Sequence, residues 1–330
     1  MTSVARAPRP CFFLPSRTGE PPVPRKMAPL AAPNLRHALS FDIEDWFHMV
    51  EIDAVADPGL WPTLPSLVVD RTRWIIDAVA EAGARATFFV LGWVAERHPE
   101  IAKAIAAGGH EIATHSFWHR RVDQLTPGEF AEDLRQSIDV LEQQSGQKVL
   151  GFRAPSFSIT PGAEWAFDVL HDEGLVYDAS LFPAKRGHGG YPCPQAAHDF
   201  KGAPSGRPMP ELPMSVARIG PLRVPFSGGG YLRLLPEALI RRGFRQFEKR
   251  GTPVVVYLHP RDFAPDCPRV PMPLHRRFKC YVGVKSTQKK LKMLLGRYAF
   301  TTCAELLGLE PSGREMQPQR RRDAETAAEK

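Results

Sequence analysis

Short β-prone runs alternate with segments of helical periodicity along most of this chain, and this alternation constrains the fold more than any other feature. The first β-prone runs cover residues 38–43, 86–91 and 109–114, and helices are expected between them over 64–82 and 94–107. Repeated strand–helix units predict a parallel sheet, built either as a barrel or as a doubly wound sheet.

The alternation continues through the second half of the chain. A helix over 126–144 is expected to begin with Thr126 as N-cap and Pro127 at its first position, and Thr160-Pro161 repeats this start for a helix to about 173. Further strands are expected over 149–152, 175–177, 222–226 and 254–258, and a further helix over 236–249. The Pro- and Gly-rich stretch 183–213 is interpreted as an inserted loop.

Polar and titratable residues fall at or just after the ends of several expected strands, which is where barrel enzymes place their active sites. We therefore favour an α/β fold with a distorted (β/α) barrel of about seven strands. The length of 330 residues, with 43% hydrophobic and 24% charged residues, is sufficient for one large catalytic domain of this kind.

Charge and cysteine content exclude several classes of protein. The net charge of +7 is dispersed and accompanies no recognised binding module, so no nucleic-acid partner is expected. The 5 cysteines contain no CxxC pair, which argues against a disulfide framework or a thiolate zinc site and favours a reducing compartment. No apolar run reaches the length of about 18 residues that a transmembrane helix needs.

Both ends of the chain have the composition of disordered segments. Residues 1–37 are rich in Pro and Arg, and Met27 is an alternative start; residues 310–330 are polar and charged. The folded part is then expected over 38–309. Because the first segment lacks the apolar core of a signal peptide, the default location is cytoplasmic, with action at the membrane face or in the periplasm left open.

His115 and His119 follow the expected strand 109–114. Imidazoles at positions i and i+4 can point to one side of a helical turn, and with one carboxylate they form the three-ligand open site of a catalytic zinc. A surface histidine pair is the alternative interpretation, because a chain with 11 histidines contains such spacings by chance.

Three carboxylates, Asp42, Glu44 and Asp45, follow the apolar run 38–41. Such neighbours repel one another unless a cation or an arginine neutralises them, which suggests one metal ligand and one general base. Alternation along a strand would put Asp42 and Glu44 on one face and favours Glu44 as the ligand, but Asp45 stays open. A solvated loop is the other interpretation of this segment.

Arg153 and His259 each follow an expected strand. Arg153 is a candidate to neutralise the carboxylates, with a surface ion pair as the alternative. His259 is a candidate general acid, with a histidine that only caps a barrel strand as the alternative.

Taken in order, four segments resemble the motifs of the polysaccharide deacetylase family (carbohydrate esterase family four, the NodB homology domain): SFDIED, HSFWH, FRAPSF and YLH. More narrowly, FDIEDWF, SGGGY and HPRDF resemble deacetylases encoded with bacterial exosortase (PEP-CTERM) exopolysaccharide gene clusters. The resemblance implies a catalytic domain over 38–309, whose region from about 260 to 309 is specific to that subfamily.

This resemblance implies a hydrolase that removes N-acetyl groups from N-acetylhexosamine units of a bacterial exopolysaccharide or its precursor. It implies a divalent metal, most often Zn²⁺, held by His115, His119 and either Glu44 or Asp45. Its implied partners are acetylated polysaccharides or oligosaccharides and the exopolysaccharide synthesis machinery.

The resemblance also implies roles for the remaining motif residues. Asp42 would be the general base, Arg153 would hold it ionised, and His259 would protonate the leaving amine. Substrate contacts are expected from Leu258 at the acetyl methyl, from the Ser156 backbone at the oxyanion, from Phe157, and from Asp178, which would also orient His259.

Two departures from the family pattern accompany these motifs. The usual adjacent aspartates are replaced by Asp42-Ile43-Glu44-Asp45, and Ser156 stands where an aromatic residue is usual, with Phe157 one position later. Two rival functions remain: a deacylase of another amide, such as a cyclic ureide or formyl amide, on the same fold, and a glycan-binding protein without turnover.

Overall fold

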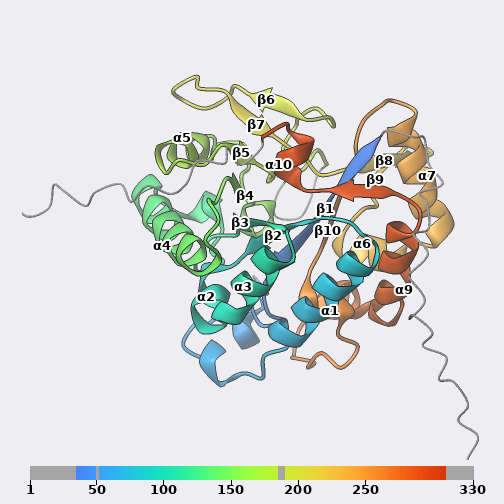
Figure 1. Cartoon of the computed structure of the whole chain (residues 1–330), viewed down its shortest axis with the longest axis horizontal. Coiled ribbons are helices and arrows are strands. Elements are labelled where there is room, and N and C mark those ends of the chain that lie inside the picture. The colour runs from blue at the N-terminus through green and yellow to red at the C-terminus, as the bar shows by residue number, and fades with distance from the viewer. Residues whose placement is uncertain (1–34, 50–51, 185–189, 310–330) are drawn as a thin grey trace, which may run out of the picture.

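A curled parallel sheet forms the centre of the computed structural model, which describes residues 35–49, 52–184 and 190–309 (Figure 1). Within these residues the sheet has 9 strands in the order β10-β1-β2-β3-β4-β5-β7-β6, with β11 also paired to β1. Every pairing is parallel except that of β6 with β7. The sheet strands are β1 (Arg36–Ile43), β2 (Thr87–Val90), β3 (Glu111–Thr114), β4 (Gly151–Phe152), β5 (Tyr177–Asp178), β6 (His198–Phe200), β7 (Met209–Glu211), β10 (Val255–Leu258) and β11 (Ala299–Thr301).

Helices pack on the outside of this sheet, and α1 to α4 cover its first strands (Figure 1). The helices are α1 (Val68–Glu81), α2 (Gly92–Arg97), α3 (Pro99–Ala107), α4 (Pro127–Ser145), α5 (Trp165–Asp172), α6 (Gly229–Leu234), α7 (Glu237–Glu248), α8 (Leu274–Tyr281), α9 (Val284–Leu295) and α10 (Cys303–Leu306). This architecture confirms the predicted mixed α/β fold of distorted barrel type, as a curled half-barrel whose two edge strands, β10 and β6, are not paired with each other in the described residues.

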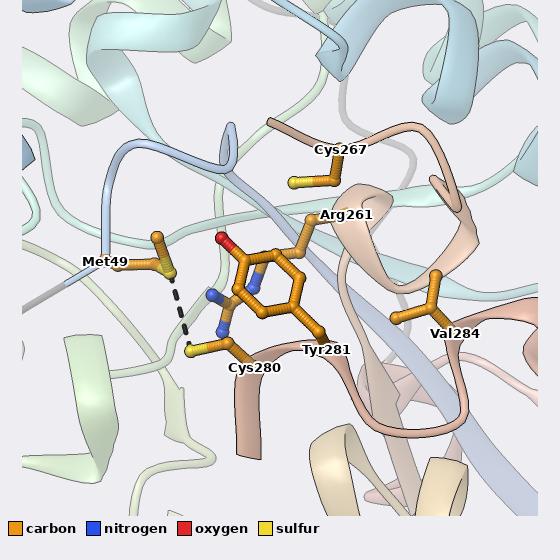
Figure 2. A pocket seen from close by; sticks show the side chains of 6 residues that line it. All are labelled: Met49, Arg261, Cys267, Cys280, Tyr281 and Val284. Carbon is orange, nitrogen blue, oxygen red and sulfur yellow. Dashed lines mark hydrogen bonds between the residues drawn. The ribbon is translucent and has the colours of Figure 1, made fainter. Parts of the chain in front are cut away.

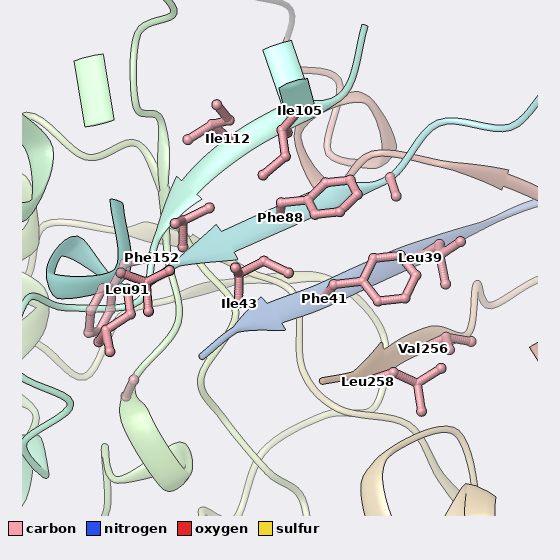
Figure 3. Close-up of a cluster of buried hydrophobic side chains, with 14 of the residues drawn as sticks. Leu39, Phe41, Ile43, Phe88, Leu91, Ile105, Ile112, Phe152, Val256 and Leu258 are labelled. Atoms are coloured by element: carbon pink, nitrogen blue, oxygen red, sulfur yellow. The ribbon is translucent and has the colours of Figure 1, made fainter. Parts of the chain in front are cut away.

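Strand alternation divides the buried side chains into two layers. Phe41, Phe88 and Leu258 face the helices and belong to the larger apolar cluster (Figure 3). Phe89 and Tyr257 face the inside of the curl and belong to a smaller cluster. Because successive strand residues point to opposite faces, Phe41 in the outer layer places its neighbour Asp42 on the inner side.

Several predicted elements differ from the observed ones. The stretch 183–213, interpreted as a loop, contributes β6 and β7 to the sheet. The strand predicted over 222–226 is β9 (Leu222–Pro225), which forms a separate antiparallel hairpin with β8 (Val216–Ile219). The helix predicted over 94–107 is two helices, because the chain leaves the helical conformation at His98 before Pro99.

The two predicted proline-led helix starts have different outcomes. Thr126 caps α4 through a capping box with Glu129, as predicted. The cap predicted at Thr160 is wrong, because α5 begins at Trp165 with no side-chain cap.

The end of the folded region returns to the first strand. Ala38 of β1 pairs with Val255 of β10 on one edge and with Thr301 of β11 on the other. β2 pairs with β1 on the same edge as β11, further along the strand. The predicted disordered segments fall on residues 1–34 and 310–330, outside the described residues, except that Arg36 and His37 already belong to β1. None of the described helices is long and apolar enough to cross a membrane.

Candidate active site and metal centre

Four predicted site residues each follow directly on the last residue of a parallel strand. Arg153 follows β4, His115 follows β3 and His259 follows β10, while Glu44 follows β1. Since the carboxyl ends of parallel strands meet at one edge of a sheet, the topology alone brings these side chains together.

Glu44, His115 and His119 form the one cluster in the described part of the chain with the composition and spacing of a metal site. One ligand atom of each residue lies within 4.8 Å of those of the other two. The carboxylate Oε2 of Glu44 is 2.5 Å from Nε2 of His119. A carboxylate oxygen and an imidazole nitrogen at this distance need a proton or a cation between them. The two imidazoles and the carboxylate therefore fit a divalent metal.

The orientation of His115 also fits a ligand. Its Nδ1 lies 2.8 Å from the backbone carbonyl of Arg153, so Nδ1–H donates there and Nε2 is left with a lone pair. Burial lowers the pKa of His115 to about 4, although Asp42 opposes the shift. The imidazole is therefore neutral near pH 7, as a metal ligand must be.

The segment 115–119 is not the helical turn that the spacing suggested. Ser116 and His119 have positive φ angles of 66° and 55°, so the two imidazoles are placed by a bent loop. Asp133 of α4 holds this loop by accepting hydrogen bonds from the backbone N–H groups of Phe117 at 2.6 Å and Trp118 at 3.3 Å. The sequence analysis missed Asp133 because nothing in its position on a helix signals this contact.

Asp45 lies outside the cluster. Its carboxylate accepts hydrogen bonds from the Ser66 hydroxyl at 2.5 Å and from the backbone N–H of Leu67, at 3.2 Å to one oxygen and 3.1 Å to the other. A further contact of 3.4 Å reaches the N–H of Val68, the first residue of α1. Asp45 thus accepts hydrogen bonds from the backbone N–H groups at the start of α1. The structure brings Glu44 rather than Asp45 to the histidines.

Asp42 is paired with Arg153 beside the cluster. Nη1 of Arg153 donates to Oδ1 of Asp42 at 2.7 Å and to the Ser40 hydroxyl at 2.8 Å, and Nε donates to the Ala179 carbonyl at 3.1 Å. Burial acts to lower the pKa of Arg153, but the charge and hydrogen bond of Asp42, together with the charges of other neighbours, raise it. The surface ion pair considered for Arg153 is wrong, since the residue is 0% exposed.

His259 is held by a carboxylate that the sequence analysis missed. Oδ2 of Asp262 lies 3.1 Å from Nδ1 of His259 and accepts its backbone N–H at 2.9 Å. Oδ1 of Asp262 is 2.9 Å from Nε of Arg233. The free Nε2 of His259 is 3.7 Å from Oδ2 of Asp42 and 3.9 Å from Oε1 of Glu44. Burial acts to lower the pKa of His259, yet the hydrogen bond and charge of Asp262 raise it.

Asp178 does not orient His259, so that part of the prediction needs correction. Its carboxylate accepts hydrogen bonds from the backbone N–H and hydroxyl of Ser180, at 2.9 and 2.6 Å. It also faces Glu211 on the neighbouring strand β7. Asp178 was placed by its position in the chain alone, which did not reveal the partner strand.

Leu258 faces the helices and is 0% exposed in the outer cluster, so it does not line the centre. The inward residue of this strand is Tyr257, whose ring centroid is 4.9 Å from that of Phe157 and 5.9 Å from that of His259. The sequence could have predicted this place for Tyr257, because residues two positions apart on a strand, such as Tyr257 and His259, point to the same face.

Ser156 and Phe157 have positive φ angles of 55° and 56°, which non-glycine residues rarely adopt. They lie in the short 3₁₀ turn Pro155–Phe157 that follows Arg153. Phe157 is directed into the inner cluster, where its ring centroid lies 5.3 Å from that of Phe182.

The fold and site define a mixed α/β domain with a His–His–carboxylate cluster at the carboxyl edge of a curled sheet. Residues 59–167 match the model of the polysaccharide deacetylase family, so this chain carries a polysaccharide deacetylase domain. Residues 179–308 match a second model, a domain of unknown function, DUF3473.

Curated relatives include a deacetylase-like protein and a deacetylase. A peptidoglycan deacetylase-like protein of Gibberella zeae is 34% identical over 113 residues, which are 34% of this chain and 32% of that protein. A peptidoglycan-N-acetylglucosamine deacetylase of Bacillus cereus is 31% identical over 122 residues, 33% of this chain and 44% of that protein. The chain therefore matches less than half the length of either relative.

Among solved structures, a Mycobacterium smegmatis protein assigned to the polysaccharide deacetylases has the same fold. It superposes with a TM-score of 0.57 at 19% sequence identity, covering 89% of this chain and 98% of that one. At this identity the likeness concerns the fold alone. The narrower resemblance to exosortase-associated deacetylases stays a prediction.

Proposed function

We propose that this chain is a metal-dependent N-deacetylase that hydrolyses the acetamide of N-acetylhexosamine units in a bacterial exopolysaccharide or its precursor. The observation that carries the proposal is the cluster of Glu44, His115 and His119, flanked on one side by Asp42, which pairs with Arg153, and on the other by His259. Zinc is the proposed metal, because two imidazoles and one carboxylate are a donor set of catalytic zinc sites.

A divalent cation held there would polarise the acetyl carbonyl and lower the pKa of a water molecule. Asp42 is proposed to accept the proton of that water, because the adjacent Arg153 guanidinium favours the charged carboxylate. Arg153 also fixes Asp42 in place, because the same Nη1 donates to the Ser40 hydroxyl and Nε donates to the Ala179 carbonyl.

His259 is proposed to supply a proton to the leaving amine. Its Nδ1–H is committed to Asp262, so the proton available for transfer is on Nε2, which faces Asp42 and Glu44. The raised pKa of His259 favours the protonated ring that a general acid needs. The backbone N–H of Ser156 is proposed to stabilise the oxyanion, and Phe157 and Tyr257 to line the acyl side of the site.

The compartment of action, cytoplasmic by default, and an association with exopolysaccharide synthesis machinery belong to the same proposal. The association follows from the proposed polymer substrate, which must be modified either during its assembly or during its export, and action at the membrane face or in the periplasm stays open.

Acetate release from N-acetylglucosamine tetrasaccharide tests the reaction. Zinc-loaded protein should release acetate, and His115→Ala should reduce the rate to background. His171→Ala removes a histidine on α5, away from the cluster, and should keep the wild-type rate. Loss of activity in both variants, or in neither, would contradict the proposal.

A further inference from the structure

Arg261 is a half-buried cation next to the proposed metal centre. It lies in the 3₁₀ turn Pro260–Phe263, two positions after His259. Its Nε and Nη1 are covered from solvent and have no hydrogen-bond partner in the described part of the chain. A guanidinium carries five N–H donors, and covering a charged donor without an acceptor is costly.

The surroundings of Arg261 offer no strong acceptor. It lines a cavity of about 10 Å³ together with Met49, Cys267, Cys280, Tyr281 and Val284 (Figure 2). Sulfur is a weak acceptor, and burial raises the pKa of Cys267 to about 11, so this thiol carries no charge near pH 7. The Tyr281 hydroxyl is committed to the Pro268 carbonyl at 2.9 Å.

The nearest carboxylates are directed at groups other than Arg261. Glu44 faces His119 at 2.5 Å, and Asp262 is shared between Arg233 and His259. Arg261 acts on Glu44 only through its charge: burial tends to raise the pKa of that carboxyl, while His119, His259 and Arg261 together lower it. The described part of the chain therefore places no carboxylate oxygen on this guanidinium.

The charge balance of the centre points the same way. Four carboxylates and three guanidiniums lie there: Asp42, Glu44, Asp45 and Asp262 against Arg153, Arg233 and Arg261. The histidine ligands are neutral when they bind a metal. A divalent cation would thus leave an excess of positive charge, which favours a negatively charged substrate.

We propose that Arg261 binds one oxygen of an oxyanion carried by the substrate beside its N-acetyl group, either a carboxylate or a phosphate. The inference rests on the proposed deacetylase function and narrows its substrate class to acidic N-acetylated glycans or glycosyl phosphates. The volume of about 10 Å³ admits about one water-sized oxygen.

Two matched pairs of substrates test this inference and separate the two sources of the oxyanion. Hyaluronan tetrasaccharide, which carries carboxylates, is compared with the neutral N-acetylglucosamine tetrasaccharide. N-acetylglucosamine 1-phosphate is compared with the neutral methyl N-acetylglucosaminide. For each pair, acetate release gives kcat/KM and calorimetry gives Kd, for the zinc-loaded wild type, Arg261→Gln and Arg269→Gln. Arg269 is the matched control, because it is an exposed arginine whose guanidinium lies 5.3 Å from the Tyr281 ring.

The wild type should prefer the anionic member of at least one pair by about 10- to 100-fold, the range for a hydrogen bond to a charged group. Arg261→Gln should lose this preference without a fall in its thermal midpoint, while Arg269→Gln should retain it. Equal preference in wild type and Arg261→Gln would overturn the inference, as would unfolding of Arg261→Gln. If no substrate is hydrolysed, the proposed reaction fails, and the Kd ratios still decide for or against the anion site.

Discussion

Oδ2 of Asp262 lies 3.1 Å from Nδ1 of His259, and the opposite oxygen of the same carboxylate lies 2.9 Å from Nε of Arg233. Arg233 in turn donates to the carbonyls of Lys279, Cys280 and Val282, at the end of α8 and just beyond it. The imidazole of His259 is thus positioned by a chain of contacts that lies entirely within the region matched by the second family model.

Asp262→Asn should lower kcat by about 10- to 100-fold, the usual effect of removing a residue that orients a functional histidine. The carboxylate raises the pKa of His259, so its loss lowers that pKa. A general acid is active while protonated, and the high-pH limb of the kcat profile should therefore move to lower pH. Asp266→Asn, which alters an exposed carboxylate paired with Arg71, is the control and should leave the profile in place. An unshifted profile in Asp262→Asn would contradict the assigned role.

Glu44→Gln and Asp45→Asn should affect different properties. Glu44→Gln should change the metal content, and Asp45→Asn should change the stability. Glu44→Gln removes a charged donor from the cluster and should reduce bound zinc, measured by elemental analysis after dialysis. Asp45→Asn should retain zinc but lower the free energy of unfolding by about 0.5–2 kcal/mol, because Asp45 accepts the N–H groups that begin α1. Zinc loss confined to Asp45→Asn would reverse the ligand assignment.

Leu258→Ala should act on stability rather than on substrate binding. The side chain is 0% exposed between the sheet and the helices, so its truncation should cost about 2–5 kcal/mol in urea unfolding. KM of the folded variant should stay close to that of the wild type. A raised KM at unchanged stability would instead support a place for Leu258 in the acetyl pocket.

The carboxylate pair Glu211 and Asp178 should make stability depend on pH. Burial and the charge of Asp178 raise the pKa of Glu211 well above its ordinary value of 4.5. A group whose pKa is higher in the folded state stabilises the fold below its unfolded pKa, and this contribution is lost as pH rises toward the folded pKa. The wild type should therefore lose stability relative to Glu211→Gln as pH rises above 4.5.

Urea unfolding at a series of pH values measures this difference. Glu132→Gln, on the exposed face of α4, is the control and should follow the wild type at every pH. A constant offset between the wild type and Glu211→Gln from pH 4.5 upward would show that Glu211 is ionised in the fold.

The sequence predicts the convergence of Asp42, His115, Arg153 and His259, because each lies at or after the end of a short apolar run, and parallel strands end at one edge. It could not predict Arg233, which reaches the centre only through the packing of α6 against α8 and α9. Leu258 was expected beside the acetyl group but lies on the helix side of the sheet, because neighbouring strand residues point to opposite faces.

The segment His115–His119 shows a different limit. Its spacing was interpreted as one turn of a helix, but the imidazoles meet through two left-handed residues and the buried carboxylate of Asp133. The strands β6 and β7 were hidden in a Pro-rich stretch, since proline argues against strands except at edges and ends.

Dependence on a metal is the central claim, and chelation followed by reconstitution tests it most directly. Protein stripped of metal and shown to be free of it by elemental analysis should release no acetate from N-acetylated oligosaccharide. Addition of about one equivalent of zinc should restore the rate, as expected for a single site of two histidines and one carboxylate. Acetate release by the metal-free protein at the rate of the zinc-loaded protein would contradict the account.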